Sequence, residues 1–164
     1  MTRAILLDRL KEFTEQAISG LLLPTKKERG ENKIECRPAD VYKMRLPDSN
    51  AAKKKAPYII HQVITGKDRQ KSGSLCESET TIRSIFCVYG EDEQEGALLL
   101  LNLMERLRIE LLKKIIIAGQ FQLLLDDSGI ETLIYPDDNT APFFAGEMVS
   151  RWRLPAVERE VSYE

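Results

Sequence analysis

The chain has 164 residues, enough for one domain with a hydrophobic core, and 43% of them are hydrophobic against 30% charged. Its net charge of -2, from 24 basic and 26 acidic residues, gives no reason to expect specific nucleic-acid binding. Three cysteines without close spacing favour a reduced intracellular setting, and no apolar run has the length of a membrane span. Early charges also argue against an N-terminal signal peptide.

The first part of the chain predicts a helix followed by an edge strand. Thr2 can cap a helix whose apolar residues recur at helical spacing, and Gly20 is placed to end it. The segment 34–46 predicts a strand. Because Pro38 cannot donate a backbone hydrogen bond, we expect this strand at the edge of a sheet.

Three polar segments, 25–33, 47–57 and 66–75, predict mobile loops. The second loop carries a run of adjacent lysines that could contact phosphate or an acidic partner. A solvated loop is the favoured interpretation, because no aromatic or further basic cluster accompanies the run. The candidate partner-binding residues in this loop are Lys53, Lys54 and Lys55.

Two β-branched segments, 58–65 and 76–89, predict the central strands of a sheet. In the second strand Ile82 and Phe86 alternate with Ile85 and Tyr89, so both faces are partly apolar. This pattern predicts a helical layer on one face of the sheet and a partner on the other.

The segment 92–114 is the longest helix signal in the chain. Acidic residues lie in its first turn and lysines in its last, which complements the helix dipole. Its apolar surface is wider than one stripe, so we expect cover on more than one side, by the sheet and another helix or by a neighbouring subunit. The predicted buried face consists of Ala97, Leu100, Leu101, Met104, Leu107 and Leu111.

The last part of the chain predicts three strands. The segments 121–125 and 130–135 are interpreted as a hairpin, with Asp126–Gly129 as its loop. The strand 143–154 alternates between an apolar face and a charged face. Charges on that face could pair across a subunit interface, which we favour slightly over a solvated surface. The candidate interface residues here are Glu147, Val149, Arg151 and Arg153.

The order helix, strands, helix, strands predicts an α+β fold, with two helices packed on a mostly antiparallel β-sheet. We expect residues 1–164 to form a single domain.

The sequence offers little catalytic chemistry. His61 lies in an apolar strand without a nearby nucleophile or carboxylate, so a structural role is favoured over a general base. The pairs Asp126–Asp127 and Asp137–Asp138 could hold a metal, but aspartate is also common in turns, and we favour that interpretation. No phosphate-binding or nucleophile motif occurs. We therefore expect a protein that is not an enzyme and uses no cofactor or metal.

From about Pro57 onward the sequence resembles the tail-terminator, or tail-completion, proteins of long-tailed bacteriophages and prophages. The segments that carry the resemblance are Pro57–Ile60, Val88–Gly96, Leu101–Arg108 and Phe144–Glu160.

The resemblance implies an α+β fold and a homo-oligomeric ring, a hexamer, at the head-proximal end of the tail tube. Such a ring ends tube polymerisation and contacts both the tail-tube protein and the head-tail connector protein. Its location is the virion tail, after assembly in the host cytoplasm. A head-tail adaptor or another tail structural protein remains an alternative, and a small metal-dependent hydrolase that uses the aspartate pairs is a second alternative.

Overall fold

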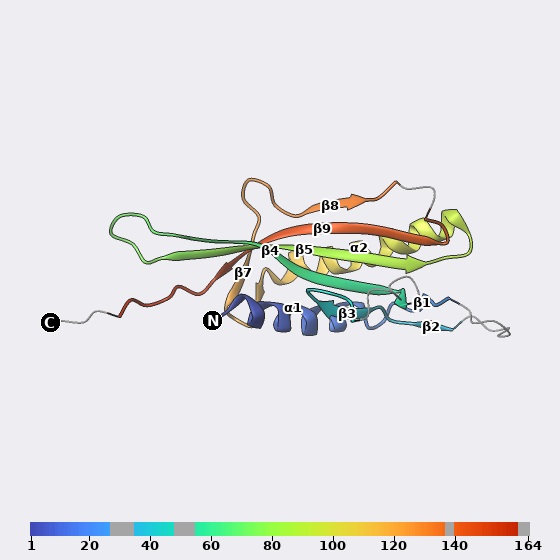
Figure 1. The fold of residues 1–164 in the computed structure, drawn as a ribbon, viewed down its shortest axis with the longest axis horizontal. Coiled ribbons are helices and arrows are strands. Elements are labelled where there is room, and N and C mark those ends of the chain that lie inside the picture. Colours follow the sequence, from blue (N-terminus) through green and yellow to red (C-terminus); the bar gives the residue numbers. More distant parts are fainter. Residues whose placement is uncertain (27–34, 48–54, 137–139, 161–164) are drawn as a thin grey trace.

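The computed structural model describes residues 1–26, 35–47, 55–136 and 140–160. Two helices pack against a curled, mostly antiparallel sheet, which confirms the predicted α+β fold (Figure 1). The elements are α1 Arg3–Ile18, β1 Leu23–Pro24, β2 Cys36–Arg37, β3 Asp40–Lys43, β4 Tyr58–Arg69, β5 Glu77–Tyr89, α2 Glu93–Lys114, β6 Ile116–Ile117, β7 Phe121–Leu124, β8 Glu131–Ile134 and β9 Phe143–Leu154.

Three long strands, β4, β5 and β9, form the centre of a seven-stranded sheet. They run antiparallel, in the spatial order β4-β5-β9. β3 lies beside β4 at one edge, as the proline in this region predicts, and this pair is parallel. β7 and β8 both pair with β9 at the opposite side, and β6 pairs with β7. β1 and β2 form a separate small ladder.

Both helices begin at side-chain caps: Thr2 was predicted as one, while Asp92 was expected inside the first turn. The Thr2 side chain accepts a hydrogen bond from the Ile5 N–H at 3.2 Å, and the Asp92 carboxylate accepts one from the Glu95 N–H at 2.8 Å. The longer helix therefore starts one residue after the Asp92 that was expected to open it. These caps satisfy backbone donors that have no partner inside a helix.

The main core lies between the helices and one face of the sheet. Its largest fully buried side chains include Trp152, Phe86 and Phe121. The predicted buried face of α2 was partly wrong, because Leu101 is 40% exposed while Leu103 is fully buried. Ala97 is exposed as well, whereas Leu100, Met104, Leu107 and Leu111 are buried as predicted. Leu103 lies about half a turn from Leu101, so the buried side is centred away from the exposed leucine.

A second, smaller apolar cluster covers part of the opposite sheet face. Residues of β4, β5 and β9 pack there against Ala56, Tyr42 of β3 and Leu46, which follows β3. The sequence predicted a partner on this face, but at this end of the sheet the chain itself provides the cover. The buried members are Ala56, Tyr58, Ile60, Cys87, Tyr89 and Phe143.

The predicted hairpin of 121–125 and 130–135 was wrong. β7 and β8 do not pair with each other; they follow one another along the same edge of β9 in the same direction. Between them the chain loops out and rejoins, with Asp127 and Gly129 at positive φ of 52° and 54°. Turn-forming residues predicted a change of backbone direction here, and the two left-handed residues instead return the chain to its original course.

The predicted loop at 66–75 was also partly wrong, because β4 continues as far as Arg69. Its last residues pair with the start of β5, from Lys67 opposite Glu79 to Arg69 opposite Glu77. This end of the β4–β5 hairpin projects beyond the helices (Figure 1). Polar composition suggested a loop, but cross-strand pairing does not require apolar side chains on an exposed hairpin.

Candidate interaction surface

The charged face of β9 lies on the side of the sheet away from the helices. Met148, Ser150 and Trp152 are buried on the helix side, while the residues between them are half-buried or exposed, as the alternation predicted. On this outer face Val149 lies opposite Arg83 of β5, and Arg151 lies opposite Thr81.

Arg151 is engaged within its own chain. Its guanidinium donates to the backbone carbonyl of Asp126 at 2.9 Å and to that residue's carboxylate at 3.0 Å. Glu79 lies 3.7 Å away on the other side. Arg151 therefore ties the loop between β7 and β8 to the middle of the sheet.

Glu147 accepts a hydrogen bond from the Tyr135 hydroxyl at 2.7 Å. Partial burial, together with this contact to a carboxylate, raises the pKa of Tyr135 above its usual value. Arg153, by contrast, is exposed. The assignment of Glu147, Val149, Arg151 and Arg153 to a subunit interface stays a prediction.

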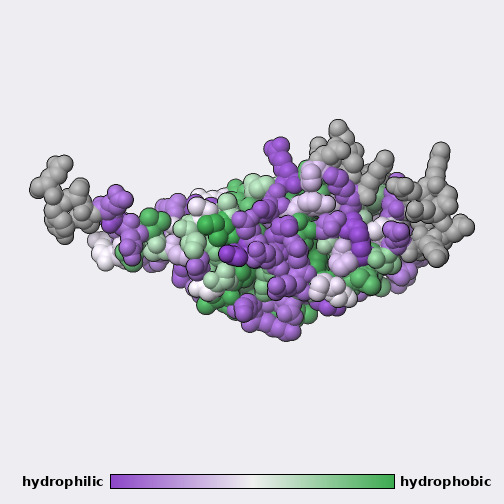
Figure 2. Space-filling view, turned by 90° about the horizontal axis from the view of Figure 1, so that it is seen from below, coloured by the Kyte–Doolittle hydropathy of each residue, from purple (hydrophilic) through white to green (hydrophobic). Residues whose placement is uncertain are grey.

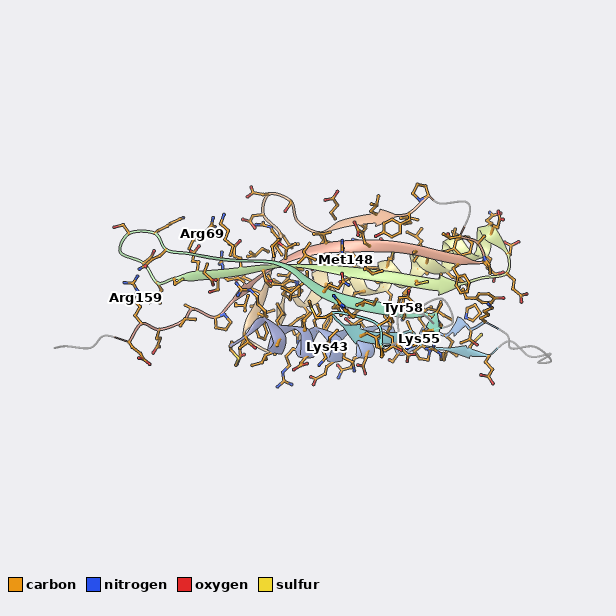
Figure 3. All side chains as sticks on the ribbon, in the orientation of Figure 1. Lys43, Lys55, Tyr58, Arg69, Met148 and Arg159 are labelled. Atoms are coloured by element: carbon orange, nitrogen blue, oxygen red, sulfur yellow. The ribbon has the colours of Figure 1, made fainter. Side chains whose placement is uncertain are left out.

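The lysine run lies at the border of the described chain. Lys55 donates to the carbonyl of Pro47, and its own carbonyl accepts from Arg37 at 3.0 Å (Figure 3). Lys53 and Lys54 lie outside the described residues, so their predicted role in partner binding stays untested.

His61 is a buried structural residue. Thr14 donates its hydroxyl proton to the Leu10 carbonyl at 2.7 Å, so its oxygen accepts from His61 Nε2–H at 2.8 Å. The other ring nitrogen, Nδ1, accepts from the Ser84 hydroxyl at 2.7 Å. Both ring nitrogens are satisfied in the neutral ring, and burial lowers the pKa of His61 to about 3. His61 thus joins α1 to the sheet.

Of the two aspartate pairs, only Asp126–Asp127 lies in the described part of the chain. Asp126 bonds to Arg151, and Asp137 and Asp138 lie outside the described residues. No group of three or more histidine, cysteine, aspartate or glutamate side chains with metal-binding geometry occurs among the residues that the structure describes. The turn interpretation of Asp126 and Asp127 fits their place in the loop between β7 and β8.

Two grooves that follow the sheet edges were not indicated by any sequence pattern. One runs between α1 and the β3 edge and is lined by residues that include Lys11, Glu15, Val41 and Tyr42. The other lies between the start of α2 and the end of β8, and Glu93, Ala97, Ile134 and Tyr135 line it. Only the topology could have revealed them, because each groove joins segments far apart in the sequence.

The projecting end of the β4–β5 hairpin is a further exposed feature. Arg69 pairs with Glu79 at 3.3 Å, and Arg3 at the start of α1 donates to the Glu79 carbonyl at 3.1 Å. Arg159 of the C-terminal segment reaches Gln70 of this hairpin (Figure 3). The hairpin is therefore linked to both ends of the described chain.

The chain matches no family model and no curated protein. In the described residues, neither helix combines the length and the hydrophobicity needed to cross a bilayer.

Proposed function

We propose that this chain is a structural protein of a long-tailed bacteriophage or prophage, which forms a ring at the head-proximal end of the tail tube. The ring ends tube polymerisation and joins the tail to the head. The proposal rests on the four sequence segments that resemble tail-terminator proteins, together with the way these segments pack.

Three of the four resembling segments meet in one packed unit. Gly90 and Gly96 lie so close that a Cβ on Gly90 would come within 2.6 Å of the Gly96 Cα. A Cβ on Gly96 would come within 2.2 Å of the Phe144 ring. The segment that enters α2 therefore packs directly on the segment that begins β9, and this contact is the observation that supports the proposal most.

Further support comes from Met104, which lies in the third resembling segment. Its sulphur would be 2.9 Å from a Cβ on Gly146, which lies in the fourth segment. Glycine at these positions permits close packing between helix and strand. The resemblance thus covers residues that specify one local architecture, which is a stronger indication than the same number of scattered matches.

The proposal is tested first by molar mass in solution, with light scattering over a range of concentrations. A hexamer has six times the 18.7 kDa mass of the chain. The second measurement is electron microscopy of gold-labelled protein mixed with purified tail tubes and, separately, with head connectors. Label at one end of each tube supports the terminator role.

Two results would contradict the proposal in different ways. Label on isolated connectors and never on tube ends would favour a head-tail adaptor. Binding to neither structure, by a protein with the far-ultraviolet circular dichroism of an α+β fold, would remove the phage-tail assignment.

A further inference from the structure

Three strands of the sheet pair on one side only among the described residues: β3 with β4, β8 with β9, and β6 with β7. The two of them that border the long strands directly are β3 and β8. They lie on opposite sides of the sheet (Figure 1). Since β8, β9, β5 and β4 alternate in direction and β3 is parallel to β4, β8 and β3 run in opposite directions.

On β8 the outward backbone groups belong to Thr132 and Ile134. The Tyr135 N–H donates to the Ala145 carbonyl at 3.0 Å, so Tyr135 faces β9. In an antiparallel ladder alternate residues face the partner, so the residues one and three positions before Tyr135 face away from β9. Their N–H and C=O groups form a short free ladder.

On β3 the outward backbone groups belong to Val41 and Lys43. The Asp40 N–H donates to the Pro57 carbonyl at 3.1 Å, and the Met44 N–H donates to the His61 carbonyl at 2.8 Å. By the same alternation Tyr42 also faces β4, while Val41 and Lys43 direct their backbone groups away from it. Each edge therefore offers backbone hydrogen-bonding groups from two residues, spaced two positions apart.

We propose that β8 of one copy pairs with β3 of the next copy as antiparallel strands, so that the sheet continues from subunit to subunit. Ile134 lies opposite Val41, and Thr132 opposite Lys43. This inference deepens the proposed function, on which it rests for the ring, by assigning the contact between its subunits. The occupant of each edge is a second copy of this chain.

The side chains agree with this register. Ile134 lies opposite Gly146 of β9, which faces Met104, and Val41 belongs to the main core, so both are on the helix side. Leu133 lies opposite Glu147, and Tyr42 packs near Tyr58, so both are on the outer side. A slip by one residue would place each apolar side chain beside the wrong face.

Exposure also favours a partner at β8. Leu133 is 51% exposed and Ile134 is 41% exposed, and β8 carries no lysine or proline to block pairing. β8 has only four residues and carries Glu131, but exposed apolar side chains beside free backbone groups make an edge strand a template for another strand. Burial of these two side chains under the next subunit provides the hydrophobic part of the contact.

The charges beside the two edges do not by themselves select this contact. Glu93 and Glu131 lie on the β8 side, while the β3 side carries both signs, with Lys11, Lys43, Glu15 and Asp40. Lys11 already pairs with Glu15, and Lys43 with Asp8, so these charges contribute less than the backbone ladder. Figure 2, which views the molecule from below, shows hydrophobic areas between the hydrophilic ones on the side where α1 lies.

A heterologous joint of this type leaves one free β3 and one free β8 after each addition, so it repeats until the ring closes. The alternative is a two-fold contact in which β8 pairs with β8 of another copy, which stops at a dimer. The experiment must therefore distinguish a β8–β3 contact from a β8–β8 contact.

The test is disulfide cross-linking in a Cys36→Ser, Cys76→Ser background. Tyr42 and Leu133 form a non-hydrogen-bonded pair in the proposed register, with Cα atoms about 4.5 Å apart, which suits a disulfide. A mixture of Tyr42→Cys protein and Leu133→Cys protein is expected to give a covalent dimer after mild oxidation. Protein with both substitutions is expected to give a ladder of multimers on a non-reducing gel.

The matched control is Thr132→Cys mixed with Tyr42→Cys, because Thr132 is on the helix side and Tyr42 on the outer side. Equal yields from Thr132→Cys and Leu133→Cys would overturn the proposed register. If Leu133→Cys protein forms a dimer on its own, and the mixture with Tyr42→Cys protein gives no additional dimer, the two-fold β8–β8 contact is established instead.

A proline substitution gives a second, independent test. Ile134→Pro removes an outward N–H and leaves the hydrogen bonds to β9 in place. We therefore expect this variant to unfold at the same urea concentration as the wild type but to lose subunit association. Leu133→Pro removes an N–H that faces β9, so this variant is expected to lose stability. Unchanged association in Ile134→Pro would overturn the inference.

The outcomes separate this inference from the proposed function. A wild-type hexamer without the 42–133 cross-link overturns the edge contact and leaves the terminator proposal standing. A 42–133 cross-link in protein that binds neither tube nor connector supports the edge contact and removes the phage assignment. A monomer at every concentration, with no cross-link even on tail tubes, overturns the edge contact.

Discussion

The hydrogen bonds of His61 link three elements of the fold through one neutral ring. Its partners Thr14 and Ser84 are 47 and 23 positions away. The sequence favoured a structural role for this residue because its strand is apolar. It could not identify the two hydroxyl partners, since these come from α1 and from β5.

Protonation of His61 is expected to destabilise the fold at low pH. Its pKa falls from 6.5 to about 3 on folding, so below the unfolded value the unfolded chain binds a proton that the folded chain does not. Stability therefore falls as pH decreases through this interval, by at most about 1.4 kcal/mol per pH unit, and the effect vanishes above it. Urea unfolding of wild type and His61→Gln between about pH 4 and about pH 7 measures the difference. Parallel curves would contradict this explanation.

Gly96 is expected to tolerate no side chain. Alanine normally stabilises a helix by about 1 kcal/mol relative to glycine. Here the added methyl group would lie 2.2 Å from the Phe144 ring, and such overpacking costs about 1–3 kcal/mol. We expect Gly96→Ala to lower the free energy of unfolding, as measured in urea.

The matched control for this substitution is Gly20→Ala, where the nearest atom is Arg106 Nη1 at 3.9 Å, an ordinary contact. Its stability should change by less than about 0.5 kcal/mol. Adding Phe144→Leu to Gly96→Ala should cost less than the sum of the two single changes. If the losses in unfolding free energy are strictly additive, the Phe144 aromatic ring is not what excludes the side chain at position 96.

At the scale of elements, the loop between β7 and β8 depends on Arg151. This side chain holds the intervening loop through Asp126, and its neighbour Arg153 is exposed. We expect Arg151→Met to accelerate amide hydrogen exchange in residues 125–130, with a loss of only about 0.5–1 kcal/mol in global stability. Arg153→Met is the control and should leave this exchange unchanged. Equal amide hydrogen exchange in both variants would show that the loop between β7 and β8 does not depend on Arg151 for its order.

Sequence patterns predicted the elements more accurately than their connections. The cap Thr2, the alternation of β9 and most of the helical spacing correspond to the structure, because these signals are local. The direction of the chain between β7 and β8 was wrong, because the same turn-forming residues suit a reversal and a loop that rejoins. The grooves beside β3 and β8 were missed, because they exist only after the sheet is assembled.

For the whole molecule, the projecting β4–β5 hairpin is expected to be unnecessary for folding. Residues 64–75 are exposed. We expect replacement of residues 70–76 by Asn-Gly to change stability by less than about 0.5 kcal/mol, since a two-residue turn can join Arg69 to Glu77. Thermal unfolding measures this.

A deeper deletion provides the contrast. A deletion that also includes Gly66 and Asp68 removes two contacts of Arg3. The Arg3 guanidinium lies 3.4 Å from the Asp68 carboxylate, and the Arg3 side chain packs on Gly66. This second variant should unfold more easily than the first. If the shorter deletion alone unfolds the protein, the hairpin belongs to the folding unit and is not an appendage.

The position of β9 has a consequence for how the protein is made. β9 follows every other strand of its sheet in the sequence, yet it pairs with β5, β7 and β8. While the ribosome is still synthesising the chain, β5 has no neighbour on one side and β8 has none at all. The sheet can therefore be completed only after β9 has left the ribosome. A message truncated before Phe143 yields a chain whose strands β5, β7 and β8 have unpaired edges that can pair with other chains.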